Sequence, residues 1–125
     1  MPGQRSEREP ALNDDVLDGL RSSLGPAANR VLAQLFRLFL KDVGPAMIDI
    51  RSAAEARDAG GLARSAHRLR GDAATIGASP LENLCAEAEL LGRAGNLTAA
   101  GGLVDLIADE LGQVEMALRE RQAAA

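Results

Sequence analysis

The sequence has very few of the residues that normally mark a β-sheet, a disulfide framework or a metal site. In 125 residues it contains no tryptophan or tyrosine, two phenylalanines, one cysteine and one histidine. β-Branched residues are scarce, which argues against a sheet. The single cysteine, Cys85, excludes an internal disulfide and suits a reducing compartment. One histidine without a second histidine or clustered cysteines does not form a usual ligand set, so we expect no metal site.

Charge and hydropathy exclude two further classes of function. The net charge is −4, whereas non-specific nucleic-acid binding usually needs a basic surface. The N-terminus is polar and charged, so no signal peptide is expected. The most apolar window, residues 31–40, is interrupted by Gln34 and Arg37 and is too short to span a bilayer. We therefore expect a soluble, cytoplasmic protein without membrane insertion or a nucleic-acid partner.

Alanine and leucine dominate instead, in a helical pattern. Apolar residues recur at spacings of three and four, which predicts helices at about residues 12–24, 27–43, 46–57, 58–77, 79–95 and 96–119. Amphipathic helices with short connections predict an all-α fold, an up-down antiparallel four-helix bundle with a short extra N-terminal helix. Residues 12–121 would form the bundle, residues 1–11 a disordered tail or linker, and residues 122–125 a frayed C-terminus.

Several local signals set the expected helix boundaries. Gly44-Pro45 predicts a break or kink between the second and third helical segments. Asp58 is a candidate N-cap, although Gly60-Gly61 would weaken the first turn that follows it. Gly77 predicts the end of that helix. Ser79-Pro80-Leu81-Glu82 has the form of a capping box, with Ser at N-cap, Pro at N1 and Glu at N3.

His67 lies on a predicted helix face that does not belong to the core. At about 100° per residue, an apolar stripe forms within roughly 80°, and His67 lies about 140° from its centre. The stripe consists of Leu62, Ala66, Leu69, Ala73 and Ile76. The other residues on the histidine face are small, namely Ala63, Gly71 and Ala74, and Arg64 and Arg70 flank it at i−3 and i+3. This arrangement suits a reactive imidazole that meets an anion, but it is also compatible with a solvated surface histidine.

The sequence around and after His67 reads Ala66-His67-Arg68-Leu69-Arg70-Gly71, then Ile76-Gly77-Ala78, Leu81, Leu84-Cys85, Glu89 and Gly92-Arg93. This pattern resembles that of the histidine-containing phosphotransfer (HPt) domain family. Upstream, Phe39-Leu40-Lys41-Asp42 followed by Pro45 resembles the family's Phe-rich helix and its proline. The spacing agrees without gaps from about Phe39 to Leu118.

The resemblance implies a phosphocarrier in two-component signal transduction. His67 would accept a phosphoryl group from the aspartyl-phosphate of a response-regulator receiver domain, which can belong to a hybrid histidine kinase, and pass it on reversibly. An ordinary imidazole, with a pKa of about 6.5, is largely neutral at pH 7 and is a nucleophile without a separate base. Such a carrier has no ATP site of its own and is not an enzyme. It needs no cofactor, because Mg²⁺ is expected on the receiver, and by resemblance it would be a monomer.

The resemblance also assigns roles to the neighbours of His67. Arg70 takes the place of the family's lysine beside the phosphoryl oxygens, and Arg64 and Arg93 are further candidate phosphoryl-stabilising cations. Gly71 would leave room for the partner's active site. Glu89 would hydrogen-bond the inner ring nitrogen and leave Nε2 as the nucleophile.

Two residues depart from the family pattern. Arg70 keeps the positive charge of lysine but changes its shape and reach. Asp72 replaces a small hydroxyl residue or glycine, and an acidic group there could repel phosphate. We expect slower or more partner-selective transfer rather than loss of function.

Alternative interpretations remain open for several residues. Cys85 lies on an apolar helix face, which favours a core residue over a reactive thiol. Phe36 and Phe39 fit the core, or one of them is exposed for docking. Glu89 could be a surface carboxylate that pairs with Arg93 at i+4.

Two functional alternatives also remain. The chain could be an HPt-fold interaction module that docks a receiver or another partner with little or no phosphotransfer, or an unrelated structural bundle. No Ser–His–Asp or Cys–His arrangement is suggested, so hydrolysis is not expected.

Overall fold

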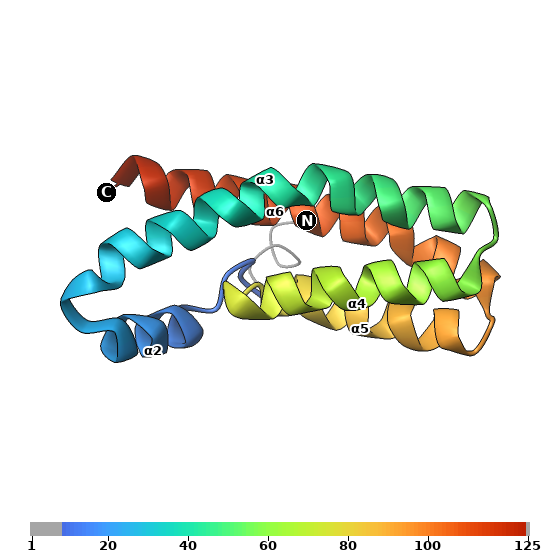
Figure 1. Ribbon diagram of the computed structural model, residues 1–125, viewed down its shortest axis with the longest axis horizontal. Helices are drawn as coiled ribbons and strands as arrows, with labels where there is room; N and C mark the ends of the chain where they lie inside the picture. The colour runs from blue at the N-terminus through green and yellow to red at the C-terminus, as the bar shows by residue number, and fades with distance from the viewer. Residues whose placement is uncertain (1–8, 125) are drawn as a thin grey trace.

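The fold is all-α, as the sequence predicts. The computed structural model describes residues 9–124, and no strand occurs in that part of the chain. The elements are α2 (Asp14–Leu24), the 3-10 helix η1 (Gly25–Ala27), α3 (Ala28–Glu55), α4 (Ala59–Thr75), α5 (Ser79–Arg93) and α6 (Leu97–Ala124). Helices α3 to α6 form an up-down antiparallel bundle, and the short α2 lies beside the first part of α3, beyond the end of the α4–α5 pair (Figure 1).

One hydrophobic core holds the four long helices together. The side of α4 that faces it is the stripe predicted from the sequence, in which each residue is at most 2% exposed. Phe36 and Phe39 are 5% and 4% exposed, so both are core residues and neither is presented for docking. Cys85 is fully buried, and burial raises the pKa of its thiol to about 12, so it is an unreactive core residue.

Helix α3 continues through Pro45, so of the two outcomes predicted at Gly44-Pro45, a break or a kink, the break is wrong. Proline removes one backbone hydrogen bond, but both Gly44 and Pro45 face solvent, where water can reach the freed carbonyl. Val43 and Ile50, on either side of the proline, are 6% and 0% exposed and lie on the same face. Packing on both sides of Pro45 therefore holds the helix together.

The predicted capping box at Ser79 is also wrong. The N-cap of α5 is Ala78, no side chain caps the helix, and Ser79 is its first residue. The chain turns directly from α4 into α5 through Gly77, whose φ is +73°, and the Ala78 N–H donates to the carbonyl of Ala73 at 2.9 Å. Ala78 is fully buried, so packing of this turn sets the start of the helix.

Asp58 caps α4, as predicted, and Gly61 supports the cap rather than weakening it. The Gly61 N–H donates to Oδ1 of Asp58 at 2.9 Å. A Cβ atom at position 61 would lie 2.3 Å from Oδ2 of Asp58, so only glycine admits this close approach. The cap fixes the first turn of the helix that carries His67.

The two ends of the described chain meet near α2. Helix α2 begins at Asp14, capped by Asn13, whose N–H also donates to the carbonyl of Gly77 at 2.7 Å. Helix α6 continues to Ala124, beyond the expected end near Arg119, and Arg121 forms an ion pair with Asp14. The predicted 1–11 tail falls mostly on residues outside the described part.

A search of the described helices for membrane spans finds none that is long and apolar enough to cross a bilayer.

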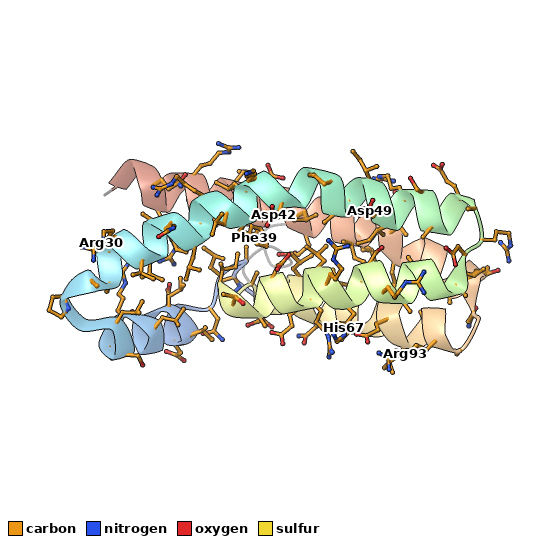
Figure 2. All side chains as sticks on the ribbon, viewed as in Figure 1. Arg30, Phe39, Asp42, Asp49, His67 and Arg93 are labelled. Carbon is orange, nitrogen blue, oxygen red and sulfur yellow. The ribbon has the colours of Figure 1, made fainter. Side chains whose placement is uncertain are left out.

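A small acidic groove lies between α3 and α4. Asp42 and Asp49 line it from α3 (Figure 2), and Asp72 and Arg68 line it from α4. Partial burial and, secondly, the charge of Asp42 raise the pKa of Asp72, while Arg68 lowers it. The fold therefore favours the neutral form of Asp72 relative to the unfolded chain.

The Asp58 cap predicts an unusual response to Gly61→Ala. Alanine normally stabilises a helix by about 1 kcal/mol over glycine, but here its Cβ would displace a cap that contributes about 1 kcal/mol. We expect no gain from Gly61→Ala in wild type and a gain of about 1 kcal/mol in the Asp58→Ala background. Urea unfolding of the four proteins measures both changes, and equal gains in both backgrounds would contradict the cap geometry.

The acidic groove predicts that Asp72→Asn stabilises the protein at pH 7. Because the pKa of Asp72 is raised on folding, its ionised form opposes folding at neutral pH. The gain should shrink as the pH falls through this raised pKa, since wild-type Asp72 then becomes protonated as well. Thermal unfolding between pH 3 and pH 7 tests this, with the exposed Asp109→Asn as a control. A gain that does not depend on pH would argue against the assignment.

Candidate functional site

His67 projects from α4 over the neighbouring α5, on the face opposite α3 (Figure 2). Ala66 and Leu69 are 0% and 1% exposed and fix the rotation of α4 about its axis. That rotation leaves the His67 side chain 56% exposed, as the sequence predicts for this face. The imidazole is therefore accessible to another protein while one edge of it contacts α5.

The edge that contacts α5 meets Glu89. Nδ1 of His67 lies 3.0 Å from Oε2 of Glu89, although 22 residues separate the two in sequence. The Glu89 side chain is only 6% exposed, so this carboxylate is not a surface group. Burial of a carboxylate is strongly unfavourable unless cations and hydrogen-bond donors surround it.

Two arginines supply the charge that Glu89 needs. Nε of Arg70, on α4, lies 3.2 Å from Oε1, and Nη2 of Arg93, one turn further along α5, donates to Oε2. Both oxygens of Glu89 are thus engaged by charge-assisted bonds, which are stronger than neutral ones. The pair with Arg93 and the contact with His67 exist together, whereas the sequence left them as alternatives.

The proton on Nδ1 of His67 can be assigned from its neighbours. Nδ1 lies 3.0 Å from Glu89 and also 3.2 Å from Nη2 of Arg70, and it cannot both donate to one and accept from the other. A carboxylate only accepts, so an unprotonated Nδ1 would face it with two lone pairs opposed. We therefore assign the proton to Nδ1, which donates to Glu89. The lone pair of the ring is then on Nε2, to which no described residue is hydrogen-bonded.

The three candidate phosphoryl-stabilising arginines differ in position. The Arg70 side chain is 39% exposed and lies beside the imidazole, and that of Arg93 is 64% exposed. Arg64 forms no ion pair with any residue in the range 9–124. Its Nη1 would lie 3.2 Å from a Cβ at position 60, so its guanidinium extends back over Gly60 and away from His67. The structure therefore brings Arg70 to the ring, but not Arg64.

Two glycines shape the site in different ways. A Cβ at Gly71 would meet nothing within 4 Å among the described residues, so no contact within that part of the chain requires a glycine there. A Cβ at Gly92 would lie 3.1 Å from backbone atoms of Ala59 and Ala63, so α4 and α5 approach closely at this point. This approach holds Glu89, one turn before Gly92, close to α4. Gly92 matches the family pattern, but its packing role was not predicted from the sequence.

Asp72 lies on the other flank of α4, in the acidic groove that faces α3. Its charged neighbours there are Asp42 and Arg68, not His67. The expectation that Asp72 repels phosphate directly is therefore not supported by its position.

No group of three or more histidine, cysteine or acidic side chains is placed to hold a metal ion within the described part of the chain.

Comparison with known proteins agrees with the fold. Residues 34–117 match the family model of the Hpt domain. The crystal structure of histidine-containing phosphotransfer protein B (HptB) from Pseudomonas aeruginosa PAO1 is similar, with a TM-score of 0.83 and 25% sequence identity. The alignment covers 94% of this chain and 99% of that one. No curated protein matches the sequence. Because the family model spans more than half of the chain, including His67, Arg70 and Glu89, the protein belongs to the Hpt domain family.

Proposed function

We propose that this histidine phosphotransfer protein accepts a phosphoryl group on Nε2 of His67 from the aspartyl-phosphate of a receiver domain and passes it to another receiver. The observation that supports this most directly is the exposed imidazole whose Nδ1 contacts the buried Glu89 carboxylate at 3.0 Å. That contact keeps the proton on Nδ1 and leaves a lone pair on Nε2. Nε2 can therefore act as a nucleophile without a base to deprotonate it. A surface histidine without a function would not need a buried carboxylate beneath it.

The transfer step follows from this proton assignment. The Nε2 lone pair forms a bond to phosphorus while the bond from phosphorus to the aspartyl oxygen breaks and the receiver's carboxylate leaves with the electron pair. The ring retains the Nδ1 proton and becomes a cation, which the Glu89 carboxylate stabilises from 3.0 Å. In the return step, a receiver carboxylate attacks the same phosphorus and Nε2 recovers its lone pair.

The surroundings of His67 suit this exchange. Arg70 lies within reach of phosphoryl oxygens on Nε2, since its Nη2 is 3.2 Å from the ring. Gly71 leaves the adjacent surface open for the partner's active site. In this proposal the receiver supplies Mg²⁺ and most of the catalytic groups, and this chain acts in the cytoplasm, as a monomer, as a carrier without its own ATP site. Arg64 would have to swing toward His67 to take part.

Phosphorylation of His67 can be tested directly. Wild type, incubated with a phosphorylated receiver and Mg²⁺, should gain one acid-labile phosphoryl group, whereas His67→Gln should gain none. Intact mass at neutral and acidic pH is the measurement, and incubation with the phosphodonor but without receiver is the control. No gain by wild type with a panel of receivers would instead favour a docking module.

Gly71→Ala should have opposite effects on the stability of the protein and on the rate of transfer from the receiver. It should raise the stability by up to about 1 kcal/mol, because alanine favours a helix and the site around Cβ is open. The rate of transfer from the receiver should nevertheless fall, because the methyl group occupies space beside His67.

Gly102→Ala on α6 is the matched control, since it is also exposed and open. It should stabilise the protein without slowing transfer. Equal transfer rates for Gly71→Ala, Gly102→Ala and wild type would argue against a partner surface at Gly71.

A further inference from the structure

The carboxylate of Glu89 has more positive partners than it needs for charge neutrality. Arg70 engages Oε1, while Arg93 and the Nδ1–H of His67 both engage Oε2. With a neutral imidazole, one carboxylate is therefore balanced by two guanidinium groups. This cluster has an excess positive charge before any phosphoryl group is bound.

The two arginines are held in different ways. Arg93 is four residues from Glu89 on the same helix, so their pairing does not depend on how α4 and α5 are placed. Arg70 comes from α4, three residues after His67, and it contacts Glu89 through Nε. Its Nη2 lies 3.2 Å from Nδ1, which is a donor in the assigned tautomer and cannot accept. Arg70 thus directs at the ring a donor that Nδ1 does not accept, which leaves this group available to another acceptor.

A phosphoryl group on Nε2 would attract Arg70 away from Glu89. Without a second cation, that movement would leave the Glu89 carboxylate, which is 6% exposed, with the imidazole ring as its remaining partner. Arg93 removes this obstacle because it binds Oε2, the oxygen that also accepts from His67. Glu89 then keeps its charge and its contact with Nδ1 after Arg70 has moved.

We propose that Arg93 is a positioning residue that holds Glu89 on Nδ1 of His67 and so allows Arg70 to move to the phosphoryl group. This inference rests on the proposed function, and it changes the role of Arg93 from a phosphoryl contact to a partner of Glu89. Arg93 acts through Glu89 and does not touch the reacting atoms.

The test compares Arg93→Gln, Arg70→Gln and the double variant with wild type. Arg93→Gln should slow transfer about tenfold, the size usual when a group that orients a functional residue is removed. Arg70→Gln should then slow it little further, because Arg70 already remains on Glu89 in the Arg93→Gln protein. Arg93→Lys should restore most of the rate, since it supplies a cation at the same position.

A second measurement follows Arg70 itself. In ¹⁵N-labelled wild type, the Nε–H signal of Arg70 should shift on phosphorylation as this group leaves Oε1 of Glu89. In Arg93→Gln the shift should be lost, and in Arg93→Lys it should return. Arg51→Gln, which removes an exposed ion pair to Asp105 at 3.3 Å between α3 and α6, is the control and should change neither result.

The outcomes separate the inference from the proposed function. Failure of wild type to take up a phosphoryl group overturns the proposed function and this inference with it. Normal uptake by wild type, with an Arg70 shift that persists in Arg93→Gln, overturns the inference alone. Multiplicative losses in the double variant also overturn it, because they would mean that Arg93 and Arg70 act independently on the phosphoryl group.

Discussion

The hydrogen bond between His67 and Glu89 is the interaction on which the site depends. A carboxylate that is 6% exposed is tolerated only because donors meet both of its oxygens. One of those donors is the histidine, so the same hydrogen bond stabilises the buried Glu89 and orients the His67 ring. The orientation determines which ring nitrogen has the lone pair, and this in turn determines which atom is the proposed phosphoryl acceptor.

The scaffold brings these two side chains together by a close approach of α4 and α5. Gly92 permits contact with the backbone of Ala59 and Ala63, and Asp58 fixes the first turn of α4 just before that contact. The tight turn through Gly77 joins the two helices at the other end. With both ends constrained, α4 has little freedom to rotate about its axis or to move along α5, so His67 stays above Glu89.

Much of this fold could be predicted from local pattern alone. The apolar stripe of α4 defined its buried side, and because side chains on a helix follow a fixed angular order, the outward direction of His67 followed. Asp58 was recognisable as a cap because its interaction spans only three residues. The close approach at Gly92 was not recognisable, since it depends on the neighbouring helix rather than on its own.

The features that were predicted wrongly or missed from the sequence all depend on packing between helices. Pro45 predicted a break or a kink, and the break does not occur because the core on both sides of it outweighs one lost hydrogen bond. Ser79 predicted a capping box, but the buried turn at Ala78 moved the start of α5 by one residue. The depth of Glu89, and the direction of Asp72 toward α3, depend on which helix lies on which side of α4. Periodicity within one helix does not contain that information.

The unequal helix lengths separate two parts of the molecule. Helices α3 and α6 have 28 residues each, whereas α4 and α5 have 17 and 15, so α4 and α5 accompany only part of the longer pair (Figure 1). The part of α3 beyond them packs against α2, and no residue of the proposed phosphoryl site comes from there. Apart from the Asn13 contact with the Gly77 turn, the α2 end can therefore change, for example to suit attachment to a neighbouring domain, without altering the residues around His67.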